Sequence, residues 1–256
     1  MLSITKTALD ESYTAGDSIT YIVSFVNTGS TPITGLTFTD DLGAYPIGSA
    51  TAVPLAYETG TLRYFVNGVL QPTPTVTAEA PLTVTGLSVP AGGNAIVVYE
   101  ALAGAAAPLE TGGTIVNTVT ATGGGISTPV SDSETVTVAE AANLSITKAL
   151  NPAVVPENGQ LTYTFVISNS GNTEADAADS VVLTDSFDPI LENITVTLDG
   201  VTLTEGVDYT YNEATGEFAT VAGRITVPAA TFAQDPVTGA YTVTPGTATV
   251  TVTGTV

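Results

Sequence analysis

The stretch Leu2-Ser3-Ile4-Thr5-Lys6 recurs letter for letter at Leu144–Lys148. Lys6 and Lys148 are the only lysines among the 256 residues. Alternate side chains of a strand point to opposite faces, so each lysine shares a face with the Leu and Ile that precede it. A buried ammonium is unfavourable unless it is paired or loses its charge. The repeat therefore predicts two related domains, each with a lysine that needs a partner on its apolar side.

The composition is that of a folded chain and excludes several classes of partner. Hydrophobic residues make up 43% of the sequence, but no apolar run approaches the roughly 18 to 20 residues of a membrane span. The formal charge of -21 excludes nucleic acid and anionic membranes as partners. Because the chain has no Cys and no His, we expect no disulfide, no metal site, no cofactor and no enzymatic turnover.

Short alternating runs rich in Thr, Val and Ile, separated by Gly, Pro, Asn and Asp about every ten residues, are typical of an all-β sandwich. The Asn67-Gly68 pair predicts a tight hairpin turn, because both residue types tolerate positive φ. The Ala-rich stretch Ala101–Ala107 is interrupted by Gly104, so we expect a strand end and a loop there rather than a helix. In the first domain, strands are expected at residues 2–7, 18–27, 33–40, 62–67, 82–88, 94–102, 114–122 and 133–138.

The pattern restarts after a short linker at residues 139–143, which predicts a first domain at 1–141 and a second at 142–256. Residues 18–29 match residues 160–171 at the offset of 142 that also separates Lys6 from Lys148. The two domains are therefore expected to share one fold.

The second domain is expected to be shorter than the first. Its last segment, Pro245–Gly254, resembles Pro90–Tyr99, which is the third strand from the end of the first domain. On this alignment the second domain lacks the counterparts of the strands at 114–122 and 133–138. The alternative is that residues 232–256 fold back as a hairpin and complete the sandwich.

Three polar residues of the first domain lie in register with apolar ones. Asp40 follows Leu36 and Phe38 on one strand face, and Asn117 alternates with apolar neighbours on another strand. Lys6, Asp40 and Asn117 are therefore candidates to meet in the core.

A buried lysine, acid and asparagine are the reactants for a spontaneous isopeptide bond. Burial favours the neutral forms of Lys6 and Asp40, so the amine becomes a nucleophile and the acid can polarise the Asn117 carboxamide. Loss of ammonia would leave an amide cross-link worth roughly 4 to 5 kcal/mol, by analogy with a disulfide that closes a long loop. The plainer interpretation makes Lys6 an edge lysine, Asp40 a turn residue and Asn117 a bulge or turn former.

In the second domain the set is incomplete, because Lys148 and Asp185 are present but the acceptor strand is missing. An unfinished sandwich exposes unpaired backbone groups, and a neighbouring subunit could cover them with its N-terminal strand Leu2–Thr7 or with a face of its first domain. Such a head-to-tail contact builds a fibre. Lys148 and Asp185 are then candidates for a cross-link between subunits.

Two weaker signals have plainer interpretations. The acidic loop Asn172–Asp179 lacks the spacing and the glycine of a calcium loop, so a solvated loop is favoured. The aromatic pairs Tyr64-Phe65 and Tyr209–Tyr211 could form a platform for sugar stacking, although aromatics on half-buried strands are more often core residues.

The segments LSITK (2–6), TYIVSFVNTG (20–29), LTFTD (36–40) and IVNTVTAT (115–122) resemble the repeat of bacterial surface proteins known as domain of unknown function eleven. The resemblance covers the whole first domain and the second up to its shortened end. It implies tandem immunoglobulin-like β-sandwiches with a structural or adhesive role on cell surfaces or in fibrous spore appendages.

We therefore expect a repeating subunit of an extracellular filament, with the chain itself as its partner and an anchoring protein on the spore or cell surface as a further one. The sequence shows neither a secretion signal nor an anchor, which favours a spore appendage made inside the mother cell. The alternative is a carbohydrate- or host-binding adhesin module, which would need an exposed aromatic platform.

Overall fold

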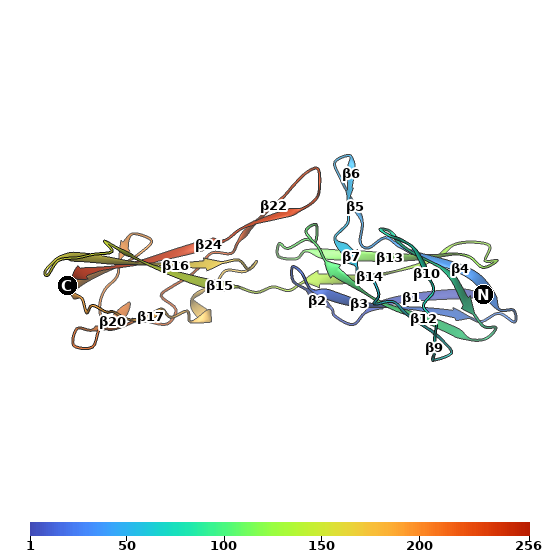
Figure 1. Ribbon diagram of the computed structural model, residues 1–256, viewed down its shortest axis with the longest axis horizontal. Helices are drawn as coiled ribbons and strands as arrows, with labels where there is room; N and C mark the ends of the chain where they lie inside the picture. The colour runs from blue at the N-terminus through green and yellow to red at the C-terminus, as the bar shows by residue number, and fades with distance from the viewer. The chain divides into compact units, whose positions relative to one another are not determined.

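The computed structural model describes residues 1–256 and divides them into two compact units (Figure 1). Unit 1 comprises Met1–Ala139 together with Ala233–Thr242, and unit 2 comprises Glu140–Phe232 with Val243–Val256. The sequence alone assigned the whole of 142–256 to the second domain, whereas the structure returns residues 233–242 to unit 1. No helix of the chain has both the length and the apolar character to cross a membrane.

Unit 1 contains two six-stranded sheets and a small hairpin. The first sheet runs in the order β1 (Leu2–Ala8), β3 (Ser18–Asn27), β12 (Asn94–Ala103), β8 (Arg63–Val66) and β9 (Val69–Gln71), with β7 (Leu55–Tyr57) also beside β12. The second sheet runs in the order β10 (Thr75–Glu79), β11 (Leu82–Val89), β4 (Ile33–Asp40), β13 (Thr114–Gly123), β14 (Val130–Val138) and β2 (Ser12–Tyr13). The hairpin pairs β5 (Tyr45–Ile47) with β6 (Ala50–Ala52).

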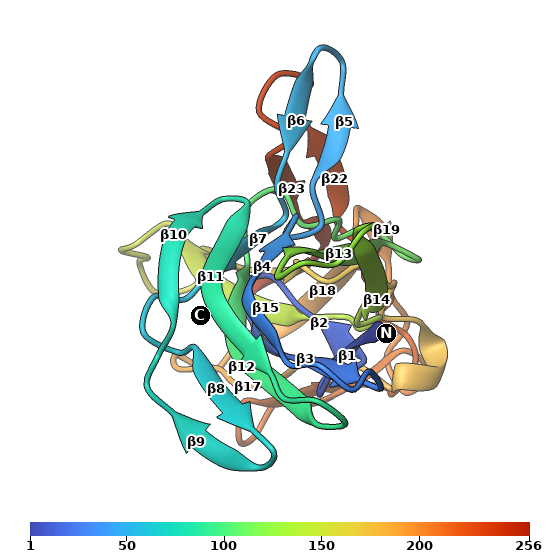
Figure 2. The same ribbon diagram turned by 90° about the vertical axis from the view of Figure 1, so that its right-hand side faces the viewer.

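Figure 2 shows the two sheets of unit 1 as separate layers, with β1, β3, β12, β8 and β9 in one and β11, β4, β13 and β14 in the other. Their facing sides form the core, because alternate residues of each strand are buried. On β1 the buried residues are Leu2, Ile4 and Lys6, so the lysine does lie on the apolar side.

Unit 2 has a similar first sheet but a much smaller second one. The first sheet runs in the order β15 (Leu144–Asn151), β16 (Gln160–Asn169), β24 (Gly246–Thr255), β18 (Glu192–Leu198) and β19 (Val201–Thr202). The second sheet contains only β17 (Thr184–Ser186), β21 (Glu217–Thr220) and β20 (Tyr209–Asn212). A single 3₁₀ turn, η1, spans Ala177–Asp179. A hairpin of β22 (Thr231–Gln234) and β23 (Tyr241–Thr244) starts and ends in unit 2, but its residues 233–242 belong to unit 1.

One buried asparagine fixes the same turn in each unit, as the sequence repeat implies. The Asn27 Nδ2 donates a hydrogen bond to the Thr31 carbonyl at 2.8 Å, and the Asn169 Nδ2 donates to the Thr173 carbonyl at 2.7 Å. Both side chains are buried, so each amide satisfies backbone carbonyls that water does not reach. The two units are tandem immunoglobulin-like β-sandwiches, and the predicted all-β fold class is confirmed.

The eight strands expected in the first domain are all present, with ends within about three residues of the predicted ones. Asn67 and Gly68 have φ values of 48° and 78° and connect β8 to β9, which confirms the predicted hairpin. The Ala-rich stretch ends β12 at Ala103 and continues as a loop, also as predicted. The short strands β2, β5, β6, β7, β9 and β10 were not predicted.

The expected shortening of the second domain has a clear counterpart in the topology. Strand β24 lies between β16 and β18, as β12 lies between β3 and β8 in unit 1. Strand β17 pairs with β21 on one side only, whereas its counterpart β4 pairs with β13 on the other side as well. Residues 232–256 do not close this edge, because β24 joins the first sheet and residues 233–242 belong to unit 1.

Candidate cross-linking site

Three strands of unit 1 bring Lys6, Asp40 and Asn117 into the core, where each is at most 2% exposed. Lys6 comes from β1 in one sheet, while Asp40 and Asn117 come from β4 and β13 in the other. In the β4–β13 register Val119 lies opposite Asp40. Asn117 is two residues away from Val119 and so projects from the same face of the sheet as Asp40. The structure thus buries all three residues that sequence periodicity had selected.

The Lys6 ammonium is enclosed by one carboxylate and two aromatic rings. Its Nζ forms an ion pair with Asp40 Oδ2 and lies 4.7 Å from the centre of the Tyr21 ring and 5.9 Å from that of Tyr99. Burial lowers the pKa of the Lys6 amine below its ordinary value, and the Asp40 charge opposes this shift only in part. A lowered pKa increases the fraction of neutral amine, which is the nucleophilic form.

Tyr99, on β12, connects the acid to the asparagine. Its hydroxyl donates to Asp40 Oδ2 at 2.6 Å and accepts a longer hydrogen bond, at 3.5 Å, from Asn117 Nδ2. Burial raises the pKa of Tyr99 well above its ordinary value, so the phenol keeps its proton and remains a donor. The backbone N–H of Leu42 donates to the other Asp40 oxygen at 3.0 Å. These contacts hold the carboxyl group in one orientation.

The Asn117 carbonyl oxygen is buried and accepts no hydrogen bond. Unsatisfied polar atoms are rare in protein cores, and each one calls for a physical explanation. An amide carbonyl that accepts no hydrogen bond is free to be protonated or polarised by an acid, as acyl transfer at an amide requires.

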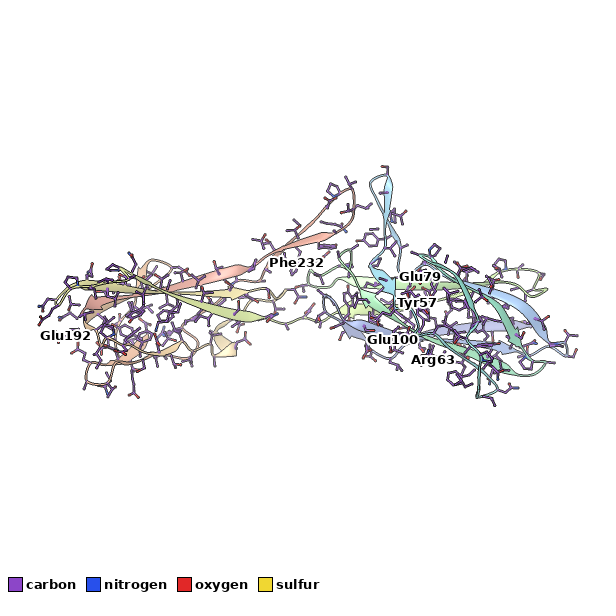
Figure 3. All side chains as sticks on the ribbon, in the orientation of Figure 1. Tyr57, Arg63, Glu79, Glu100, Glu192 and Phe232 are labelled. Atoms are coloured by element: carbon purple, nitrogen blue, oxygen red, sulfur yellow. The ribbon has the colours of Figure 1, made fainter.

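Sequence reasoning missed Tyr99, although a signal was present. Tyr99 alternates with Ala95, Val97 and Ala101, so strand periodicity alone places it in the core. A hydroxyl on such a face needs a polar partner. Tyr57, labelled in Figure 3, packs against the Tyr99 ring with the ring centres 6.4 Å apart.

Unit 2 contains half of the same site. Lys148 Nζ forms an ion pair with Asp185 Oδ2, and these side chains are 40% and 18% exposed rather than buried. The ammonium lies over Tyr163, the counterpart of Tyr21, with 4.5 Å to the ring centre. The position of Tyr99 is taken by Val252, which faces Tyr163 across the β16–β24 ladder. Unit 2 therefore has the amine and the acid but neither the phenol nor the asparagine.

Two weaker sequence signals have structural explanations. In the acidic loop, Asp176 and Asp179 form a capping box around η1, so their carboxylates bind backbone N–H groups. Tyr64 and Tyr209 are 6% and 4% exposed, and the Tyr64 hydroxyl donates to the Ser88 carbonyl at 2.7 Å. These tyrosines are core residues, so they do not form an exposed platform.

Comparison with known proteins gives one family match, and no curated protein matches the chain. Residues 139–254, which cover most of unit 2, match the family model described as the Sgo0707 N2 domain.

Solved structures that match the chain include the pilus backbone RrgB of Streptococcus pneumoniae, which is 14% identical over 96% of this chain with a TM-score of 0.39. A second match is BcpA, the major pilin subunit of Bacillus cereus, which is 9% identical over 92% of this chain and 61% of its own, with a TM-score of 0.39. A third is the collagen-binding domain of a Staphylococcus aureus adhesin, which is 17% identical over 54% of this chain and 95% of its own, with a TM-score of 0.32. The chain spans 55% of the length of the RrgB structure.

Proposed function

We propose that the chain is a structural subunit, or a repeated part of one, in an extracellular bacterial filament. The observation that carries this proposal is the open edge of β17 in unit 2, beside a first sheet that is otherwise complete. Folded proteins rarely leave such an edge uncovered, because its backbone N–H and C=O groups invite pairing with another strand. A strand from a neighbouring subunit would complete unit 2 and join the subunits head to tail.

The sequence had suggested the N-terminal strand as a possible donor. In the structure, Leu2–Ala8 is paired along its whole length with β3, and its apolar side chains are buried in unit 1. This strand is therefore already paired within its own subunit. We therefore propose that the donor is a different segment of the neighbouring subunit.

Unit 1 is proposed to be hardened by an isopeptide bond between Lys6 and Asn117. The neutral Lys6 amine attacks the Asn117 Cγ, and Asp40 transfers the amine proton to the departing amide nitrogen. The C–N bond to Nδ2 breaks, ammonia leaves, and an Nζ–Cγ amide remains. The step consumes no oxidant or cofactor, and it proceeds once per molecule rather than as turnover. This bond would join β1 in one sheet to β13 in the other.

The resemblance to tandem surface repeats and the pilin-like arrangement of strands support an extracellular location, and we propose the spore surface as the specific one, with synthesis in the mother cell. The partners would be further copies of the subunit and an anchoring protein. The adhesin alternative has less support, because Tyr64 and Tyr209 lie in the cores.

Electron microscopy with antibodies raised against residues 1–256 tests this function directly. Gold label should follow thin fibres on spores, and negative staining of the full-length protein purified from its source should show filaments with a regular axial repeat. Label on vegetative cell walls only would overturn the spore assignment. A full-length protein that stays monomeric at high concentration, with label confined to the cell interior, would overturn the filament.

A further inference from the structure

We propose that unit 2 is a covalent acceptor for one kind of β-strand. The strand belongs to a partner polypeptide, carries an asparagine flanked at alternate positions by apolar residues, and becomes joined through that asparagine to Lys148. This inference deepens the proposed filament function, on which it rests, by stating the chemistry of the partner segment.

The first argument is the geometry of the open edge. In unit 1, β4 is paired with β13 over Leu36 to Asp40, with Val119 opposite Asp40. In unit 2, β17 carries Asp185, the counterpart of Asp40, and has no neighbour on the equivalent side. A strand that pairs there in the same register places a side chain beside Asp185, as β13 places Asn117 beside Asp40.

The second argument is the difference between two strands that begin with the same five residues. Leu2 and Ile4 of β1 are 6% and 8% exposed, but Leu144 and Ile146 of β15 are 39% and 53% exposed. In unit 1, β1 packs against β13 and β14, and the backbone N–H of Lys6 donates to Asp132 on β14 at 2.8 Å. Unit 2 has no counterpart of these two strands. The exposed apolar face of β15 is therefore the surface that an incoming segment would cover.

The third argument is the state of the polar pair. Asp185 Oδ2 is inaccessible to solvent and pairs with Lys148, yet it accepts no hydrogen bond. In unit 1 the equivalent oxygen accepts one from Tyr99, whose place in unit 2 is taken by the apolar Val252. An incoming carboxamide can donate its N–H directly to Asp185, which leaves its carbon facing the amine. The pair is thus an amine and an acid without an acyl donor, and an N–H of that donor would take the place of the missing Tyr99 hydroxyl.

Unit 1 also defines the pattern of the partner strand. The asparagine stands two residues before the one opposite the acid, with Ile115 two residues before it, Val119 two residues after it and Ala121 four residues after it. With Ile or Val on both sides, this pattern occurs only at β13 in the 256 residues. That strand is already paired with β4 and β14 in unit 1, so the neighbouring subunit would supply the matching strand from a part of its polypeptide outside residues 1–256.

The reaction follows the same balance as in unit 1. A bond forms between Lys148 Nζ and the Cγ of the partner's asparagine, and the bond from that carbon to the amide nitrogen breaks. Asp185 carries the amine proton to the leaving group, and ammonia is released.

A fusion protein tests the proposal with the segment that occupies the equivalent place in unit 1. Residues 113–138, which contain β13 and β14, are attached after Val256 through a flexible Gly/Ser linker, and the intact mass is measured beside that of the unfused chain. We expect the fusion to lose one ammonia more than the unfused chain, and tandem mass spectrometry to join residue 148 to the asparagine of the graft. Lys148→Arg keeps the charge but cannot form the amide. The fusion with this substitution should therefore lose one ammonia fewer than the parent fusion.

Hydrogen exchange of the same fusion separates docking from chemistry. The backbone amides of β17 and β15 should become protected when the graft is present, in both the parent fusion and the Lys148→Arg variant. Absence of added protection overturns the docking of such a strand. Protection without the additional ammonia loss overturns the covalent step. If the unfused chain also shows no ammonia loss, the isopeptide chemistry proposed for unit 1 has failed, which is a separate result from failure in unit 2 alone.

Discussion

The hydroxyl of Tyr99 connects three buried polar side chains into one cluster. Without it, Asp40 would keep its contact with Lys6, but no hydrogen bond would connect Asn117 to that pair. Periodicity could select Lys6, Asp40 and Asn117, because each alternates with apolar residues on its own strand. It could not reveal the role of Tyr99, because that role depends on β12 lying across from β4, which is a fact of tertiary structure.

The mass of the intact chain is the most direct test at this scale. The wild-type protein should be lighter than its sequence by one ammonia, and Lys6→Ala or Asn117→Ala should restore the full mass. Asp40→Asn keeps the shape but cannot carry a proton, so it should also block the reaction. Tyr99→Phe should slow bond formation by about one to two orders of magnitude, because the carboxamide loses its anchor. A wild-type mass equal to the sequence mass would contradict the cross-link.

The pH dependence of stability should reveal the buried amine when no bond can form. In Asn117→Ala, Lys6 stays buried, and its pKa in the folded chain lies below the ordinary value of 10.5. At pH values between the lowered pKa and the ordinary one, the unfolded chain therefore binds more protons than the folded chain. The free energy of unfolding should therefore rise with pH across that window, up to about pH 10, where unfolded tyrosines begin to ionise. Urea titrations at several pH values measure the slope.

The control for this slope is the double variant Lys6→Met with Asn117→Ala, which retains every other titrating group. Its stability should be flatter over the same range. Equal slopes in the two proteins would show that folding does not lower the pKa of Lys6.

At the scale of the strand, β1 and β15 show how little local sequence decides about burial. Both begin with Leu-Ser-Ile-Thr-Lys and both pair with the next long strand, yet one is half buried and the other exposed along its length. The alternation of the sequence correctly predicted the strands and their apolar faces. The exposure of β15 follows instead from the absence of two strands far away in sequence, which could be inferred only by aligning the two domains.

The short strands that the sequence did not reveal have a different cause. Strands β5, β6 and β7 contain three residues each, and Pro46 lies within one of them. Runs of this length are below the four to eight residues over which alternation can be recognised. Their pairing is set by the long strands around them.

Matched substitutions on β1 and β15 should therefore differ in cost. Ile4→Ala removes buried methyl groups and should destabilise unit 1 by about 2 to 4 kcal/mol. Ile146→Ala, at an exposed position, should change the stability of unit 2 by less than about 1 kcal/mol. Chemical denaturation followed by the tyrosine signal measures both. A large loss of stability in Ile146→Ala would mean that other residues already cover the apolar face of β15.

At the scale of the whole molecule, the chain holds one sandwich that is complete and one that is not. The segment Ala233–Thr242 belongs to unit 1 although it lies between strands of unit 2. Within unit 1, Gln234 donates to the Tyr45 hydroxyl at 2.6 Å and the Tyr241 backbone N–H donates to the Ala105 carbonyl at 2.8 Å. Nothing in the alternation of residues 233–242 indicates these partners, so the sequence could not predict that this segment belongs to unit 1.

Unfolding should therefore proceed in two steps that respond to different substitutions. Lys6→Ala should lower the free energy of unfolding of unit 1 by about 4 to 5 kcal/mol because loop closure is lost, and its effect on packing adds to this. The free energy of unfolding of unit 2 should not change. Asn117→Ala gives the loop-closure effect with the lysine still present. Differential scanning calorimetry resolves the two transitions, and a single transition that shifts as a whole in either variant would contradict this division.

The proposed bond between Lys6 on β1 and Asn117 on β13 would also determine how tension passes through unit 1. Load that enters at Met1 would reach Lys6 within six residues, cross the amide to Asn117 and leave toward Ala139 along β13 and β14. The roughly 110 residues from 7 to 116 are bypassed, and if they were free to extend at about 3.5 Å each they would add nearly 400 Å of length. A unit built in this way resists stretching with covalent bonds rather than with its hydrogen bonds, so a fibre under shear would keep its length while its incomplete sandwiches, at the joints, bear the strain.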